Sequence, residues 1–304
     1  MIEKVEMIFI PLFLVTLVHV QVHASLPDNR PAYDQRTFHS KAIDDLITNL
    51  VPLFNDADIA TIFQNCLPNT LDTTVSYTTP NPQSTTPNNL DSFVITGDID
   101  ALWLRDSMNQ VLPYIPYASE DTSLQYLVEG LINRQAKSVI IDPFANAFNF
   151  NASGQGHQSD SRKPPMKASV FEGKYEIDSL NAFMKLSYWY WRYTSDDKLV
   201  SLANEQWLHA MDTLLDTVAT MQKDTGRLSD PPYLFARMTT EALDTLSVQK
   251  RGPPCQPNGM TRSLFRPSDD AVMLPYNVPG KRHVYVSCVH ISPFFLNPIP
   301  PYPL

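Results

Sequence analysis

Hydrophobic side chains recur at helical spacing along much of the chain. The cleanest repeat occupies residues 208–221, where apolar residues follow one another at intervals of three and four. The same spacing appears in four further stretches, residues 43–54, 59–66, 124–132 and 177–191. Asp121 and Ser123 lie at the start of the third of these stretches and are candidate N-caps. These patterns predict a fold dominated by amphipathic helices.

Strand signals are sparse by comparison. Residues 73–78 and 92–95 are short and β-prone, and they flank a segment rich in proline, asparagine, serine and threonine. They predict a hairpin closed by a long loop. No apolar runs alternate with the helices as they do in βαβ units, so a doubly wound sheet is not expected. Helices joined by long, proline-rich loops instead indicate an all-α toroid with its functional site on the loops.

The first residues resemble a targeting segment. Residues 8–18 are nearly all apolar, and residues 22–24 place small or medium side chains where a signal peptidase cleaves. The pattern predicts a signal peptide over residues 1–24 and a secreted protein. The apolar run is shorter than the ~20 residues of a spanning helix, so stable membrane insertion is not expected. An uncleaved anchor is the alternative, because two glutamates outnumber one lysine before this run.

The last residues differ from the rest. The helical pattern stops after Gly280, and five prolines crowd the final dozen residues. A proline ring cannot continue a helix. We therefore expect a domain over residues 25–280 and a separate proline-rich tail over residues 281–304, such as a retained intron would encode. An ordinary proline-rich tail is the alternative.

Composition changes this picture little. The 304 residues fit one large domain or two small ones, and 43 % hydrophobic content is enough for a sizeable core. The net charge of -9, without a basic patch, argues against nucleic acid as a partner. Cys66, Cys255 and Cys288 form no CxxC pair, which argues against a common zinc or redox motif. Cys66 and Cys255 form either a disulfide or two buried free thiols.

A glycosylation sequon begins at Asn151, which agrees with a secretory route. Polar residues also gather among aromatic ones in three clusters, over residues 96–107, over 142–149 with 174–179, and over 259–270. Asp, Asn and Arg side chains bind sugar hydroxyls, and paired carboxylates supply a general acid and a general base. The clusters therefore suit a sugar site.

Each of these residues also has a structural interpretation. Asp98 could cap a helix beginning at Ile99, and Arg105 could form an ion pair with Asp106. Trp103 could belong to the core, and Asp269 with Asp270 could cap a following helix. Glu176 and Asp178 lie two residues apart, so on one helix they would point to different faces and not act as a pair.

Five motifs follow one another in order: TGDIDALWLRDS at 96–107, INRQ at 132–135, DPFANAFN at 142–149, KYEIDSL at 174–180 and GMTRSLFRPSDDAV at 259–272. Together they resemble glycoside hydrolase family 125, especially its fungal members. The resemblance covers roughly residues 35–280. It implies an (α/α)6 barrel and a metal-independent, cofactor-free exo-α-mannosidase that removes terminal α-1,6-linked mannose from glycans with inversion.

The resemblance also implies roles for individual residues. The general acid is Asp269 or Asp270, and a neighbouring carboxylate would raise the pKa of the one that donates the proton. The matching positions that would bind the sugar are Asp98, Trp103, Arg105, Asp106, Asn146, Asn149, Glu176 and Arg266.

The sequence departs from the family at its end. In the family the general base is a glutamate in the C-terminal part of the barrel, and no glutamate follows Glu241 here. We therefore expect a barrel that is incomplete at the C-terminal end, without its base and of doubtful activity. One alternative is an inactive mannose-binding remnant. Another is a different all-α toroid sugar enzyme whose acid and base both lie in residues 98–178.

Overall fold

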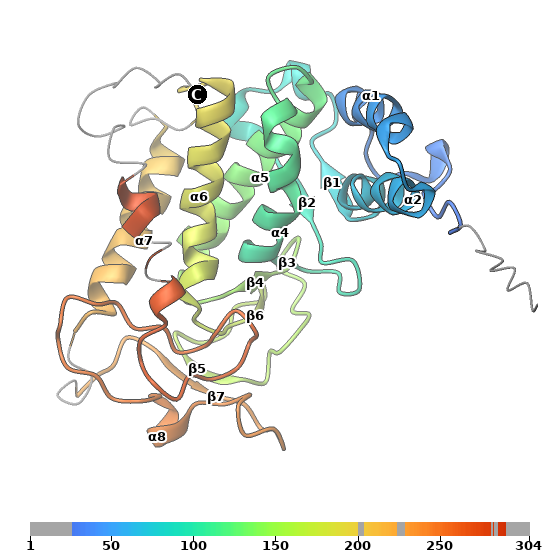
Figure 1. The fold of residues 1–304 in the computed structure, drawn as a ribbon. Coiled ribbons are helices and arrows are strands. Elements are labelled where there is room, and N and C mark those ends of the chain that lie inside the picture. Colours follow the sequence, from blue (N-terminus) through green and yellow to red (C-terminus); the bar gives the residue numbers. More distant parts are fainter. Residues whose placement is uncertain (1–25, 200–203, 224–228, 281, 283–284, 290–304) are drawn as a thin grey trace, which may run out of the picture.

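The computed structural model describes residues 26–199, 204–223, 229–280, 282 and 285–289. Helices dominate it, and they stand side by side in Figure 1, with α5 and α6 flanked by α4 and α7. The α-helices are α1 Lys41–Leu50, α2 Ala57–Cys66, α3 Asn69–Thr73, α4 Leu104–Val111, α5 Thr122–Ile141, α6 Ile177–Thr194, α7 Glu205–Thr220 and the short α8 Ser247–Lys250.

Within the described residues, three small antiparallel sheets complete the fold. The first pairs β1 (Val75–Thr78) with β2 (Ser92–Val94), the second has the order β3 (Leu102–Trp103), β4 (Ala147–Phe148), β6 (Val170–Glu172), and the third pairs β5 (Ser161–Lys163) with β7 (Leu234–Ala236). The second and third sheets lie together at the lower end of the helices in Figure 1, among the loops that follow α5 and α7. This end of the molecule carries most of the polar motifs.

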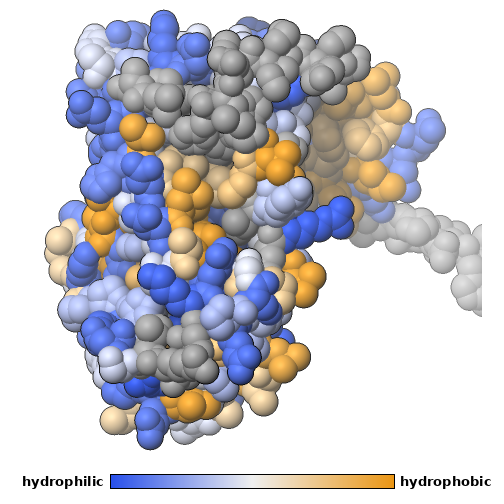
Figure 2. Space-filling view, turned by 90° about the vertical axis from the view of Figure 1, so that its left-hand side faces the viewer, coloured by the Kyte–Doolittle hydropathy of each residue, from blue (hydrophilic) through white to orange (hydrophobic). Residues whose placement is uncertain are grey.

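The core lies between the helices because each buries its apolar stripe against its neighbours. α4 packs on α6, and α5 packs on both α6 and α7. Trp207 of α7 is buried, and its indole N–H donates to the Ser187 hydroxyl of α6 at 3.0 Å. The face turned to the viewer in Figure 2 is mostly hydrophilic, with apolar patches along its middle.

Most of the predicted elements are present. Helices occupy all five stretches with helical spacing, and Asp121 caps α5 by accepting hydrogen bonds from the backbone N–H groups of Ser123 and Leu124. The predicted hairpin is β1 with β2. The helix-rich fold agrees with the expected fold class, while closure into an (α/α)6 ring stays a prediction.

Some expectations differ from the structure. Residues 97–100 form bends and α4 begins only at Leu104, so Asp98 caps no helix. No helix starts directly after Asp270, so the capping interpretation of that aspartate pair is wrong as well. Residues 285–289 are helical, although the pattern predicts no helix there.

Other expectations concern the ends and the cysteines. The predicted signal peptide lies outside the described residues, and no helix within them is long and apolar enough to span a bilayer. None of the three cysteines, all of which lie in the described residues, forms a disulfide: Cys66 is exposed, Cys255 is buried and Cys288 is half-buried. The structure therefore contains neither of the two alternatives for Cys66 and Cys255: they form no disulfide, and Cys66 is not buried. Asn151 is exposed, and its glycosylation stays a prediction.

Candidate active site

The centre of the candidate site is the guanidinium of Arg105, in the first turn of α4. It pairs with Glu176 at 2.6 Å, with Asp106 at 3.1 Å and with Asp178 at 3.2 Å. The ion pair predicted between Arg105 and Asp106 is thus confirmed as one contact of a larger cluster. A guanidinium presents five donors in a rigid plane, so it can orient several carboxylates at once.

Glu176 and Asp178 contact the same guanidinium, contrary to the prediction that they point apart. The reason is local: α6 begins at Ile177, and Glu176 is its N-cap residue with extended backbone angles of φ -118° and ψ 124°. The helical geometry on which the prediction rests does not apply before Ile177. The Glu176 carboxylate also accepts a hydrogen bond of 2.8 Å from the Ser179 hydroxyl.

The Glu176 side chain has no exposed surface, which makes its charge costly. Burial raises its pKa well above the usual value, the positive charge of Arg105 opposes this rise, and a hydrogen bond with Asp269 adds to it. Two adjacent carboxyl groups of this kind hold a proton more readily than one alone. The cluster is therefore a place where a proton is retained.

Asn146 joins the middle motif to the last one. Its amide Nδ2 lies 3.2 Å from an Asp269 carboxylate oxygen, 3.0 Å from Glu172 and 3.5 Å from Glu176. Its amide oxygen accepts the backbone N–H of Lys174 at 3.2 Å. Residues more than a hundred positions apart in the chain therefore meet at one amide group.

Asp269 is held from two sides. Its backbone is left-handed, with φ at 65°, which is uncommon for a residue with a side chain. The Lys174 ammonium donates to the Asp269 carbonyl at 2.8 Å and to the Asp244 carboxylate at 2.7 Å. Asp270 lies outside this network, because its carboxylate accepts from Arg266 and from Ser268, both at 3.0 Å.

A cavity of about 520 Å³ borders the cluster. Arg105, Asp178, Asn181 and residues 266–268 are among the residues that line it. Asp178 Oδ1 and Asn181 Oδ1 are buried and have no hydrogen-bond partner among the described residues. Unpaired buried acceptors are rare in folded proteins, so they are candidate partners for the hydroxyl groups of a ligand.

Three predicted sugar-binding residues lie apart from the cluster. Asp98 is exposed and accepts a hydrogen bond from the Thr96 hydroxyl at 3.1 Å. Trp103 is 8 % exposed and packs its ring 5.4 Å from that of Phe171. Asn149 donates to the backbone carbonyls of Gln155 and Ala168, which orders its own loop.

The sequence patterns do not predict the ion pairs around Glu172. Arg237 pairs with Glu172 at 3.0 Å, with Asp160 at 2.7 Å and with Asp244 at 3.0 Å. Nothing in their spacing along the chain places Asp160 beside Arg237, which lies 77 positions later. Within the described ranges no three His, Cys, Asp or Glu side chains are arranged to hold a metal ion.

Comparisons with known proteins agree with the resemblance. A curated relative is the meiotically up-regulated gene 157 protein of Schizosaccharomyces pombe, 40 % identical over 279 residues, which are 88 % of this chain and 53 % of the relative. A similar solved structure is a Streptococcus pneumoniae metal-independent α-mannosidase, determined as a non-productive substrate complex with α-1,6-mannobiose. It superposes with a TM-score of 0.73 at 31 % identity, covering 83 % of this chain and 56 % of that one.

The chain thus spans about half the length of both proteins. The sequence pattern of one family, described as metal-independent α-mannosidase (GH125), matches residues 56–296 and so extends past Gly280. The five motifs and the Arg105 cluster all lie within the matched range. The chain belongs to glycoside hydrolase family 125, the metal-independent α-mannosidases.

Proposed function

We propose that this chain takes part in hydrolysing terminal α-1,6-linked mannose from glycans, by a metal-independent and inverting mechanism. Family membership supports a glycoside hydrolase that acts on α-mannosyl linkages, and the pneumococcal relative was captured with α-1,6-mannobiose. The observation that carries the proposal is the Arg105 cluster beside a cavity with unpaired acceptors. Asn146 joins Asp269 to this cluster.

Asp269 is the better candidate for the general acid. It is half-buried, so it can both meet a ligand and contact Asn146 and the buried Glu176. Asp270 pairs instead with Arg266, and the two side chains are 41 % and 48 % exposed. Asp269 hydrogen-bonds Glu176, whose buried carboxyl group has a raised pKa, so a proton held by Glu176 lies beside the proposed acid.

Glu176 is not suited to be the base. An inverting enzyme needs a second carboxylate across the ring, about 6.5–9.5 Å from the acid, with room for a water molecule. Glu176 instead hydrogen-bonds Asp269 on the acid's own side and has no exposed surface. We also discount Glu172, because Lys174 and Arg237 already neutralise it. This argues against the alternative in which acid and base both lie within residues 98–178.

The test is hydrolysis of α-1,6-mannobiose by the chain, by Asp269→Asn and by Asp270→Asn. If Asp269 is the acid, its substitution lowers the rate by about 10²–10⁴-fold. Asp270→Asn, the matched control, keeps the rate within about tenfold. Equal losses of rate in both variants would contradict the choice of Asp269 over Asp270. Undiminished hydrolysis in both variants would show that neither aspartate is the general acid.

A second candidate function is mannose binding without hydrolysis. The observation in its favour is that Asp178 Oδ1 and Asn181 Oδ1, buried beside the cavity, have no hydrogen-bond partner among the described residues. Calorimetry with α-1,6-mannobiose separates the two functions. Heat of binding that is lost in Arg105→Met, with no mannose released by the unmodified chain, would support binding alone. Release of mannose that needs Asp269 would support the hydrolase.

A further inference from the structure

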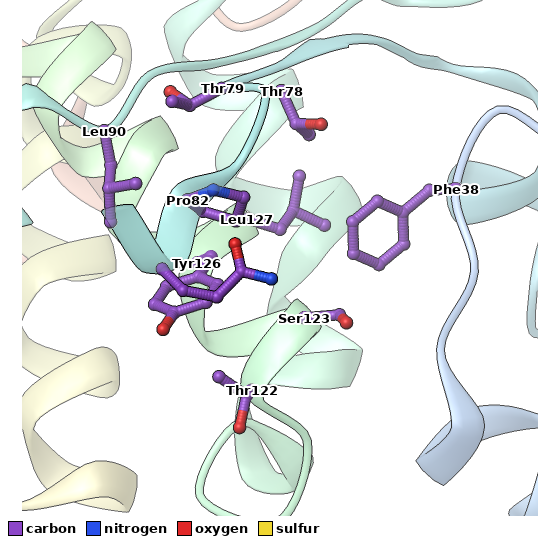
Figure 3. Close-up of a pocket in the computed structure, with 10 residues that line it drawn as sticks. Phe38, Thr78, Thr79, Pro82, Leu90, Thr122, Ser123, Tyr126 and Leu127 are labelled. Atoms are coloured by element: carbon purple, nitrogen blue, oxygen red, sulfur yellow. The ribbon is translucent and has the colours of Figure 1, made fainter. Parts of the chain in front are cut away.

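A second cavity, of about 360 Å³, lies away from the Arg105 cluster (Figure 3). One wall is Phe38, another is the start of the loop between β1 and β2, and the third is the first two turns of α5. The residues that line it are Phe38, Thr78, Thr79, Pro82, Gln83, Leu90, Thr122, Ser123, Tyr126 and Leu127. Its volume is at the lower end of the ~300–1,000 Å³ typical of ligand pockets, which suits a ligand of monosaccharide size.

The lining has a distinctive chemistry. It contains no charged side chain, so an ionic ligand would lose its hydration without gaining an opposite charge. It instead offers the hydroxyls of Thr78, Thr122, Ser123 and Tyr126 and the amide of Gln83. Within the described part of the chain none of these five side chains makes a hydrogen bond, although each group can donate and accept. They are free to bind a neutral ligand rich in hydroxyl groups.

Aromatic rings supply the apolar surface. The rings of Phe38 and Tyr126 lie on opposite sides of the cavity in Figure 3, with Leu127 and Ser123 between them. Both aromatic residues are half-buried, so one face or edge of each stays accessible. A pyranose combines apolar C–H faces with a rim of hydroxyls, and rings flanked by hydroxyl and amide groups match both features.

The cavity is separate from the candidate active site. Thr122, Ser123 and Tyr126 lie at the N-terminal end of α5, whereas the chain reaches Asn146 only after the C-terminal end of that helix. A helix of 20 residues is about 30 Å long. One short disaccharide cannot occupy both places, so a ligand in this cavity would be a different part of a large glycan or a second molecule.

We propose that this pocket is a second sugar site, which holds a neutral pyranose of a glycan while another part of that glycan is processed elsewhere. That the sugar is mannose rests on the proposed function; that it is an uncharged pyranose rests on the lining. Such a site would raise the local concentration of a branched glycan by avidity and would take no part in bond cleavage.

The test uses methyl α-D-mannopyranoside and nuclear magnetic resonance of the methyl groups of the intact chain. The methyl signals of Leu90, Leu127 and Thr78 should shift with mannoside concentration. Tyr126→Ala should weaken this response about tenfold, because truncating an aromatic anchor in a small site typically has such an effect. Tyr193→Ala, also a partly exposed tyrosine on a helix, is the matched control and should leave the response unchanged.

Ser123→Trp should fill the pocket and abolish the response. It should still fold, because Asp121 caps α5 through the backbone N–H of residue 123 and not through its side chain. Two outcomes would overturn the proposal. One is methyl shifts of equal size with glycerol, and the other is methyl signals that stay unchanged at high concentrations of the mannoside. The result is independent of hydrolysis: a response at this pocket with no release of mannose would contradict the hydrolase alone.

Discussion

At the residue scale, the Arg105 cluster brings one cation together with several carboxyl groups, among them the fully buried Glu176. Such a group survives in a folded protein because each charge is offset by a neighbour or by a shared proton. Glu176 is the member whose protonation should have a measurable effect on stability. Its carboxyl group is buried in the folded chain and fully hydrated in the unfolded chain.

We predict that Glu176 makes folding less favourable as pH rises. Burial raises its folded-state pKa, so from about pH 4.3 upward the unfolded chain releases a proton that the folded chain retains. The contribution is most favourable below that pH and is lost as the pH rises through the raised pKa. Urea unfolding between pH 4 and 8 should show this slope in the wild type, and Glu176→Gln should flatten it.

The control for this experiment is Glu241→Gln, a glutamate that is exposed. Its substitution should leave the pH dependence of the free energy of unfolding as in the wild type. If Glu176→Gln left the slope unchanged as well, the side chain would have to be ionised in the folded state, and Arg105 would then outweigh burial.

At the scale of an element, α5 holds the hairpin loop between β1 and β2 and the start of α4 through consecutive residues of the INRQ motif. Asn133 donates to the carbonyls of Pro87 and Leu90, and Arg134 pairs with Asp91. Gln135 donates to the Leu104 carbonyl and to the Ser107 hydroxyl, which fixes the start of α4. The motif resembles a family signature, yet its contacts hold the hairpin loop and the helix that presents Arg105.

We predict that Gly130→Ala destabilises the protein, although alanine favours helices over glycine by about 1 kcal/mol. Gly130 faces β2, and an added Cβ would lie 2.3 Å from Ser92 Oγ and 2.7 Å from the Asp91 carbonyl carbon. Because backbone atoms must move, overpacking should lower the free energy of unfolding by about 1–3 kcal/mol. Urea titration measures it.

Asn49→Ala provides a comparison at an exposed position of α1. Helix propensity alone acts there, so the free energy of unfolding should change by no more than about 0.7 kcal/mol. A stabilising effect of Gly130→Ala would mean that β2 does not approach α5 as closely as the structure shows.

At the scale of the whole molecule, the helices and the loop-rich end are joined by buried ion pairs. Arg162 of β5 forms a two-point contact with Asp142, the C-cap residue of α5, at 2.6 and 3.1 Å. Neither side chain has any exposed surface. This pair connects the sheet of β5 and β7 to the helix that supports the candidate site.

We predict that Arg162→Met lowers the free energy of unfolding by about 3–5 kcal/mol, because it leaves a buried carboxylate without its partner. The double variant Arg162→Met with Asp142→Asn should lose less than the single variant, since the unpaired charge is gone. Thermal and urea unfolding of both variants measure the difference. Independent, additive losses would show that the two residues do not depend on each other.

The chain spans only about half the length of each relative described above, so the activity of those relatives is a proposal for this chain. Several large apolar side chains near its C-terminal end are exposed, among them Met273 at 81 % and Leu274 at 76 %. Hydrolysis of α-1,6-mannobiose by this length of chain is therefore the direct test of the proposed mechanism.

The helices, the hairpin and the family can all be predicted from the amino-acid sequence. Each of these is set by neighbours along the chain: apolar spacing defines the helices, Asp121 caps α5 through the next residues, and five ordered motifs define the family. The same local reasoning failed for Glu176 and Asp178, because the exact start of a helix decides where side chains point and depends on packing.

Which polar residues share a site depends on how the chain packs in three dimensions. Asn146, Glu176 and Asp269 come from three separate motifs, and Asn149, three positions from Asn146, serves its own loop instead. Likewise, Asp269 meets the cluster while Asp270 pairs at the surface, although the two are adjacent in the chain. Contacts across such sequence separations are fixed by how helices and loops pack, which local spacing does not encode.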